Sequence, residues 1–202
     1  MMLTVDDQFS CVGGHALGFH ATGGFETVRF VEINSWRRSV LAARFPGVPI
    51  IEDVHDAQGI EANVLVGGPP CQKTSVAAAI HGRRTGESLW PEMARIIGEG
   101  TYDWIIIEQP PGNKAWESEV AGDLENLGFG HTRLDLSALG LGAPHLRRRV
   151  FYLAHRDHER LEIARQAGPR EAERIAGGTV DGNPWGAPVP GDLRVADGVP
   201  GG

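Results

Sequence analysis

The sequence predicts an α/β fold built on a doubly wound, mostly parallel sheet of seven strands. Short apolar runs alternate with amphipathic stretches over the first 155 residues, which is typical of repeated strand–helix–strand units. Runs such as Val64–Gly68 and Trp104–Gln109 are apolar nearly throughout, as expected of strands buried in the middle of a sheet. A glycine pair at Gly13-Gly14 lies between the first predicted strand and the first predicted helix.

The elements follow from these patterns. The strands are expected at Leu3–Ser10, Thr27–Ile33, Val48–Glu52, Val64–Gly68, Trp104–Gln109, His131–Leu136 and Val150–His155. The helices are expected at Gly14–Thr22, Trp36–Arg44, Pro91–Gly98 and Trp116–Asn126. Lys73–Leu89 has little periodicity, and we expect a long loop there, of the kind that usually carries function or is disordered.

The chain changes character after His155, which suggests one domain over residues 1–155 followed by a weakly structured region over 156–202. Arg156–Ala176 is charged and alanine-rich, which is compatible with a single exposed helix. Gly177–Gly202 is crowded with glycine and proline and is not expected to form regular structure by itself.

Composition limits the classes of protein that the chain can represent. With 41% hydrophobic residues and no apolar run long enough to span a membrane, the 202-residue chain reads as a soluble domain, and no signal pattern precedes it. We therefore expect it in the cytoplasm. Two cysteines are too few for a disulfide framework, so a free thiol is expected. The net charge of -7 argues mildly against nonspecific nucleic-acid binding, although arginines cluster at 83–84 and 147–149.

Pro69-Pro70-Cys71-Gln72 is the most informative stretch. It places a thiol at the carboxyl end of a buried strand, where ligand crevices form in α/β sheets, and the two prolines stiffen its approach. Glu108 ends a later buried strand, so a nucleophile and an acid can meet at one edge of the sheet. A cysteine taken alone is more often a small buried apolar residue, and it is the combination with Glu108 that favours catalysis.

Three further positions are candidates for ligand binding. The glycines of Phe9–Gly14 allow a close approach to a ligand, although turn glycines need no ligand to explain them. Glu32 ends the second strand, where an acid commonly binds ribose hydroxyls, or it is a solvated strand end. Asp53 follows the third strand and can equally be a helix cap.

Taken in order, these motifs resemble the cytosine-C5 DNA methyltransferase family. The segments that carry the resemblance are Phe9–Gly14, Glu32, Asp53-Val54, Gly68–Gln72 with Ser75, Glu108–Pro110 and Pro144–Val150, across about three quarters of the chain. The resemblance implies a Rossmann-like class I methyltransferase fold. The tail fragment Leu193–Pro200 also looks like a segment that some phage members carry before their last motif.

The resemblance implies S-adenosyl-L-methionine as the cofactor, lying over the carboxyl ends of the first strands. Phe9 would pack on the adenine, Glu32 would bind the ribose hydroxyls, and Asp53 would lie at the adenine edge. The remaining cofactor-binding positions would be Gly13 and Gly14 at the methionine part, Ile33 and Val54 as apolar walls, and Pro70.

The resemblance also implies a covalent mechanism on a cytosine flipped out of DNA. Cys71 would attack C6, and Glu108 would protonate N3. Arg149 and Arg147 would hold the base or orient Glu108. The expected nucleic-acid contacts are Gln72, Ser75, Arg83 and Arg84, the last two in a loop that closes over the base. No metal is expected, because the histidines lack paired ligand spacing.

The chain departs from the family pattern at several points. Cys11 stands where the family usually has glycine, Gln109-Pro110 replaces Asn-Val, and His145-Leu146 replaces Gln-Arg. The chain reaches Gly202 without the family's final Gly-Asn motif, and Arg156–Asp192 is short for a target-recognition region.

These departures leave several hypotheses open. The chain is a minimal enzyme acting on DNA, an enzyme that needs a second chain to supply the final motif, or a catalytically silent subunit that binds DNA or a partner. An RNA substrate and transfer of a group other than methyl are also compatible with these residues. The sequence does not predict which DNA sequence is recognised.

Overall fold

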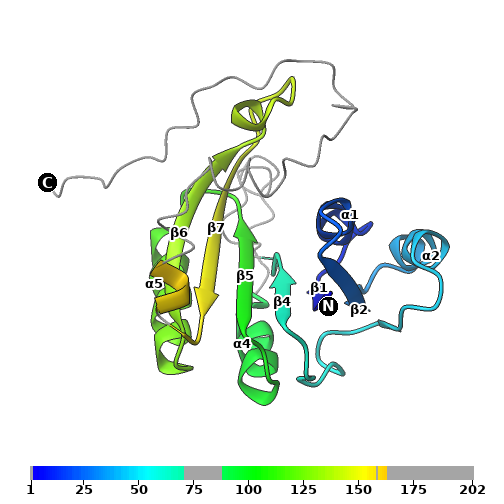
Figure 1. Cartoon of the computed structure of the whole chain (residues 1–202), viewed down its shortest axis with the longest axis horizontal. Coiled ribbons are helices and arrows are strands. Elements are labelled where there is room, and N and C mark those ends of the chain that lie inside the picture. The colour runs from blue at the N-terminus through cyan, green and yellow to red at the C-terminus, as the bar shows by residue number, and fades with distance from the viewer. Residues whose placement is uncertain (1, 71–87, 158, 163–202) are drawn as a thin grey trace, which may run out of the picture.

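The computed structural model describes residues 2–70, 88–157 and 159–162, and these residues form one seven-stranded sheet with the strand order β3-β2-β1-β4-β5-β7-β6 (Figure 1). The strands are β1 (Leu3–Gln8), β2 (Phe25–Val31), β3 (Ile50–Ile51), β4 (Val64–Gly67), β5 (Trp104–Gln109), β6 (Gly130–Ser137) and β7 (Arg148–His155). Only β7 runs antiparallel to its neighbours, β5 and β6, while the other pairs are parallel. The predicted doubly wound, mostly parallel sheet is confirmed.

The helices and strands agree with the sequence to within a few residues. The helices are α1 (Gly14–Ala21), α2 (Ser35–Arg44), α4 (Trp90–Glu99) and α5 (Lys114–Asn126), with a short 3-10 helix η1 (Leu139–Leu141). The largest differences are in β2, which ends at Val31, and in β3, which contains two residues. Most of the expected loop, residues 73–87, and most of the expected helix after Arg156 lie outside the described residues.

The helices begin at recognisable signals and bury apolar stripes against the sheet. Asn34 and Asn113 cap α2 and α5, because their side-chain oxygens accept the backbone N–H of Arg37 and Trp116. The main core lies under α4 and α5. It includes Trp90, Met93, Ile96 and Ile97 of α4, Trp116, Val120 and Leu124 of α5, and Leu65, Ile105, Ile107, Val150 and Ala154 of the sheet. On the other face, near α1, Val5, Val64 and Val66 pack with Phe19.

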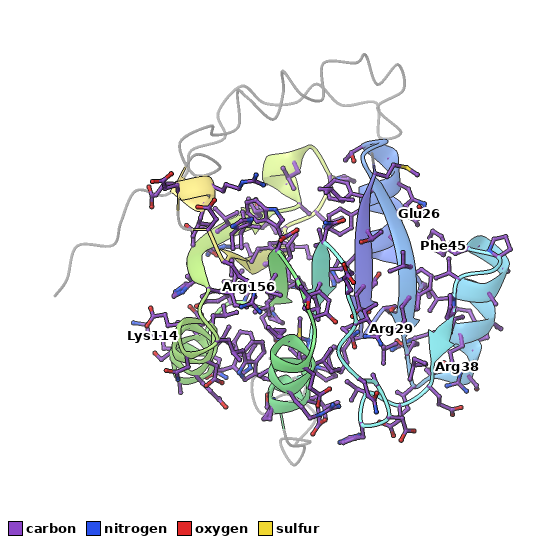
Figure 2. The ribbon with its side chains drawn as sticks, turned by 60° about the horizontal axis from the view of Figure 1, so that its bottom comes forward. Glu26, Arg29, Arg38, Phe45, Lys114 and Arg156 are labelled. Carbon is purple, nitrogen blue, oxygen red and sulfur yellow. The ribbon has the colours of Figure 1, made fainter. Side chains whose placement is uncertain are left out.

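The central strand β1 is unusual because Asp6, Asp7 and Gln8 are consecutive and completely buried. Asp6 accepts two hydrogen bonds from Arg29 of β2, the residue labelled in Figure 2. Tyr102 and Gln8 also donate to the Asp6 carboxylate. A polar cluster therefore lies inside the sheet.

The turn after β1 contains residues in the left-handed backbone conformation and packs closely against α2. Gly13 has φ +83°, and a Cβ there would lie 2.6 Å from the Phe45 ring. Cys11 has φ +53°, in the left-handed region that favours glycine. The position at which the resemblance implies glycine thus has a backbone conformation that glycine adopts without strain. Among the described helices, none is long and apolar enough to cross a membrane.

Candidate functional site

A cavity of about 300 Å³ lies at the carboxyl ends of β1 to β4, where the strand order reverses direction between β1 and β4. Ligands in open α/β sheets bind at this switch point, and the volume is at the small end of the range for ligand pockets. Its walls come from the turns after four strands and from the start of α4. The lining residues are Phe9, Cys11, Val31, Glu32, Ile33, Arg37, Glu52, Asp53, Val54, His55, Gly68, Pro70 and Leu89.

Glu32 is the most firmly held polar group in this cavity. One carboxylate oxygen accepts the backbone N–H of Cys11 at 2.8 Å, and the other accepts that of Asn34, also at 2.8 Å. The Arg37 guanidinium lies 3.5 Å from the same carboxylate. The carboxylate is thus fixed between the β1 and β2 turns, where it can receive hydrogen bonds from hydroxyls of a ligand.

The other cofactor-binding predictions divide into two groups. Phe9, Ile33, Asp53, Val54 and Pro70 line the cavity, and their contacts with a cofactor stay a prediction. Gly13 and Gly14 are not among its lining residues.

The charged or titratable lining residues that the sequence did not single out are Arg37, Glu52 and His55. His55 donates to Asp53 from its backbone at 3.0 Å, and its ring Nδ1 lies 2.7 Å from the same oxygen. These hydrogen bonds lower the pKa of Asp53 and raise that of His55. The only sequence signal for Arg37 is its position three residues after the cap Asn34. The only signal for His55 is its position two residues after Asp53.

Glu108 lies at the end of β5, and its carboxylate forms an ion pair with Arg149 of β7. Both side chains are 23% exposed, so the pair is reachable from solvent while partly shielded from it. Gly68 lies against this pair, because a Cβ at that position would lie 2.9 Å from Oε2 of Glu108. Since Gly68 also lines the cavity, the acid and the cavity meet at the β4 turn.

Arg147, the second arginine predicted to act on the base, is exposed, and its side chain makes no hydrogen bond or ion pair with the described residues. The structure therefore brings Arg149, and not Arg147, to Glu108. The predicted nucleophile Cys71 and the predicted nucleic-acid contacts Gln72, Ser75, Arg83 and Arg84 lie outside the described residues.

The turn that leads to Cys71 is anchored on both sides. The Gln109 side chain donates a hydrogen bond to the Pro69 carbonyl, and this bond connects β5 to the turn. The backbone N–H of Leu89 donates to the Pro70 carbonyl at 3.2 Å. The residues that flank positions 71–87 are thus held together at the cavity rim.

A titratable pair beside the site was missed by the sequence analysis. Nδ1 of His15, in the first turn of α1, lies 3.3 Å from Oδ1 of Asp7, whose other oxygen has no hydrogen-bond partner among the described residues. Burial raises the pKa of Asp7, and His15 opposes that rise. Burial lowers the pKa of His15, but Asp7 and, more weakly, Glu108 outweigh it, so that the pKa is raised overall.

This pair predicts a loss of stability with rising pH. Both groups have raised pKa values in the folded state, so the folded chain binds more protons, and the stabilisation present at low pH is lost as pH rises through these values. The loss begins above about pH 4 for Asp7 and above about pH 6.5 for His15. We expect the Asp7→Asn, His15→Gln double variant to flatten the fall in unfolding free energy between about pH 5 and about pH 8.

Urea denaturation across this pH range measures the effect. The Glu125→Gln, His131→Gln double variant is the matched control, since that pair is 4.0 Å long and exposed on the glutamate side, and its pH dependence is expected to follow the wild type. Equal slopes for the wild type and the Asp7 and His15 double variant would contradict the prediction.

The fold and the site together define the class of protein. Solved structures of DNMT2 share the fold. A mutant from Spodoptera frugiperda aligns with a TM-score of 0.63 and 19% identity, covering 76% of this chain and 50% of its own. The S. pombe Dnmt2 methyltransferase aligns with a TM-score of 0.61 over the same shares. This is the Rossmann-like fold of class I methyltransferases. The chain belongs to the C-5 cytosine-specific DNA methylase family, whose match spans residues 3–177.

Curated relatives agree with this family. Type II methyltransferase M2.BsuMI of Bacillus subtilis (strain 168) is 31% identical over 164 residues, which cover 75% of this chain and 42% of that protein. Type II methyltransferase M.AquIA of Picosynechococcus sp. is 27% identical over 178 residues, covering 73% and 70%. The matches to the first two relatives, M2.BsuMI and M1.HphI, span less than half of each relative's length.

Proposed function

We propose that this chain transfers a methyl group from S-adenosyl-L-methionine to C5 of cytosine in DNA, through a covalent bond between Cys71 and C6. The observation that carries the proposal is the position of the β4 turn. Gly68 and Pro70 line the cavity, Gly68 abuts Glu108, and Cys71 follows Pro70 directly in the chain. A cofactor in the cavity and a base beside Glu108 would therefore both lie next to the thiol.

The cavity fits the cofactor by its chemistry. Phe9, Ile33 and Val54 offer apolar surface for a purine ring, and the fixed Glu32 carboxylate offers acceptors for two ribose hydroxyls. The cofactor supplies an electrophilic methyl group on a sulfonium.

The reaction needs a nucleophile and an acid from the protein. C5 of cytosine is too weak a nucleophile by itself, so the Cys71 thiolate forms a bond to C6 while N3 takes a proton from Glu108. The electron pair at C5 then forms the bond to the methyl group, while the bond between that group and the sulfonium sulfur breaks and its electron pair stays on the sulfur as a neutral thioether. A water molecule takes the C5 proton, the electrons of the C5–H bond form the C5–C6 double bond, and the bond between the Cys71 sulfur and C6 breaks. These steps release 5-methylcytosine and the Cys71 thiolate, and N3 returns its proton to Glu108.

Arg149 acts on Glu108 from the neighbouring strand. Its ion pair fixes the orientation of the carboxyl group before the base arrives. The Gln109 hydrogen bond to Pro69 has the corresponding role for the turn that carries Cys71, because it ties that turn to the strand carrying Glu108.

A Cys71→Ser variant tests the nucleophile. Serine is a far weaker nucleophile at neutral pH, so we expect no methyl transfer and no covalent complex. Mass spectrometry of nucleosides from DNA and RNA of cells that express either chain measures the product and the nucleic acid together. DNA with 5-fluorocytosine at the target traps the adduct, since C5 then has no proton to lose.

The outcomes separate the hypotheses. A 5-methylcytosine peak from DNA that disappears in the variant supports the proposal, and a peak only in RNA moves the substrate to RNA. An equal peak in the variant would contradict the role of Cys71. The requirement for a second chain is tested with the purified protein. Methyl transfer by this chain alone would show that no second chain is needed.

A further inference from the structure

The connection between β6 and β7 projects beyond the carboxyl edge of the sheet (Figure 1). It carries exposed apolar side chains. We call residues 138–148 the β6–β7 tip. Leu139 of η1 is 49% exposed, Leu141 is 56% exposed, and Leu146 is 78% exposed, the highest value among the large apolar side chains described as exposed. Three leucines in one short connection form an apolar patch of the kind that marks an interaction site.

The tip also carries positive charge with little to neutralise it. Arg147 and Arg148 are exposed, and the one ion pair that Arg148 forms within the described part of the chain is long, 3.7 Å to Asp135. That aspartate is already paired with Arg133 at 2.8 Å. The arginines are complementary to anionic groups on the surface of a partner, and the leucines beside them are complementary to apolar groups that lie behind those anionic groups.

The tip is continuous with the site. Arg149, the residue after the tip, pairs with Glu108, so a base held at Glu108 lies next to the β7 end of the tip. A cytosine can reach Glu108 only if its duplex lies along the carboxyl edge of the sheet, since the base must leave the stack to react. The tip extends from that same edge.

We propose that the β6–β7 tip binds duplex DNA beside the flipped cytosine, with Arg147 and Arg148 on backbone phosphates and Leu146 inserted against the neighbouring bases. Leu139 and Leu141 broaden this apolar contact. Apolar side chains that enter the base stack partly unstack it, which favours extrusion of a base. The inference rests on the proposed function, because it places DNA at this edge.

Binding of the full chain to a labelled duplex, measured by fluorescence anisotropy, tests the apolar contact. We expect Leu146→Ser to weaken binding about tenfold, on the order of the transfer free energy of one leucine. Leu3→Ser is the matched control, because Leu3 is exposed at the opposite edge of the sheet, and its binding is expected to equal the wild type. A duplex with a mismatched target cytosine flips more readily, so the Leu146→Ser defect should shrink there.

Salt dependence tests the arginine contacts. Each of Arg147→Ala and Arg148→Ala should reduce the slope of log affinity against log salt concentration by about one. Arg160→Ala is the control and should leave the slope unchanged, because Arg160 forms an exposed ion pair beyond the C-terminal end of β7. Thermal unfolding of Leu146→Ser reports whether Leu146 packs within the protein instead.

The results distinguish this inference from the proposed function. If the wild type methylates DNA while Leu146→Ser binds as tightly as the wild type, the tip proposal fails alone. A large loss of thermal stability in Leu146→Ser would also overturn it, since the leucine would then pack within the protein. A wild type that neither binds nor methylates DNA would overturn both.

Discussion

Replacing Glu108 with glutamine is expected to lower the rate of methyl transfer by about 10²- to 10⁴-fold, the usual contribution of a positioned general acid. Glutamine keeps the shape of the side chain but has no acidic proton for N3. It also removes the negative charge that pairs with Arg149, so the orientation of the side chain loosens. Single-turnover transfer of a labelled methyl group to DNA measures the chemical step directly.

The same variant should leave cofactor binding unchanged, because Glu108 is not among the residues that line the cavity. Glu119→Gln, on the exposed side of α5, is the matched control and is expected to react at the wild-type rate. A Glu108→Gln rate within about threefold of the wild type would remove Glu108 from the chemistry, since a general acid contributes at least about 10²-fold.

The largest effect on stability is expected from Asp6→Ala, at about 3–5 kcal/mol of unfolding free energy. Asp6 is completely buried and accepts from Arg29 Nε at 2.9 Å and from Arg29 Nη2 at 2.6 Å. Tyr102 donates to the same carboxylate at 2.9 Å, and burial, followed by the Asp6 charge, raises the pKa of Tyr102, which keeps its hydroxyl proton in place.

Removing the carboxylate leaves the Arg29 guanidinium, with a side chain only 9% exposed, without its counter-ion. Since small domains are stable by only about 5–15 kcal/mol, such a loss is a large part of the total. Urea denaturation at constant m-value measures it. Glu125→Ala is the control: its ion pair with His131 is 4.0 Å long and exposed on the glutamate side, and we expect a change below about 1 kcal/mol. A similarly small change in Asp6→Ala would show that the cluster contributes little.

The sequence predicted the elements because their signal is local. An unbroken apolar run such as Trp104–Ile107 indicates a buried strand whatever its neighbours are, and the stripe of Trp90, Met93, Ile96 and Ile97 indicates a helix face. The motif residues at strand ends could be assigned for the same reason, since parallel strands end at one edge. Glu32, Asp53 and Glu108 are all found there.

The choice between Arg147 and Arg149 needed the strand register. In the antiparallel pairing of β5 with β7, Glu108 lies opposite Phe151. Because alternate residues of a strand share a face, Arg149 lies on the face of Glu108, whereas Arg148 lies on the other face and Arg147 precedes the strand. No property of three consecutive arginines in the sequence distinguishes them.

The sequence by itself determined the order and type of the elements and the family, and it proposed the reactive residues. Only the tertiary structure decided which distant groups meet: Asp6 with Arg29 and Tyr102, Asp7 with His15, and Gln109 with Pro69. The pattern of apolar residues indicates which side chains face the interior. Asp6, Asp7 and Gln8 are polar and nevertheless buried in a central strand, so this pattern does not reveal their burial. The partner that makes burial of Asp6 tolerable lies 23 residues away, and only the pairing of β1 with β2 brings it into contact.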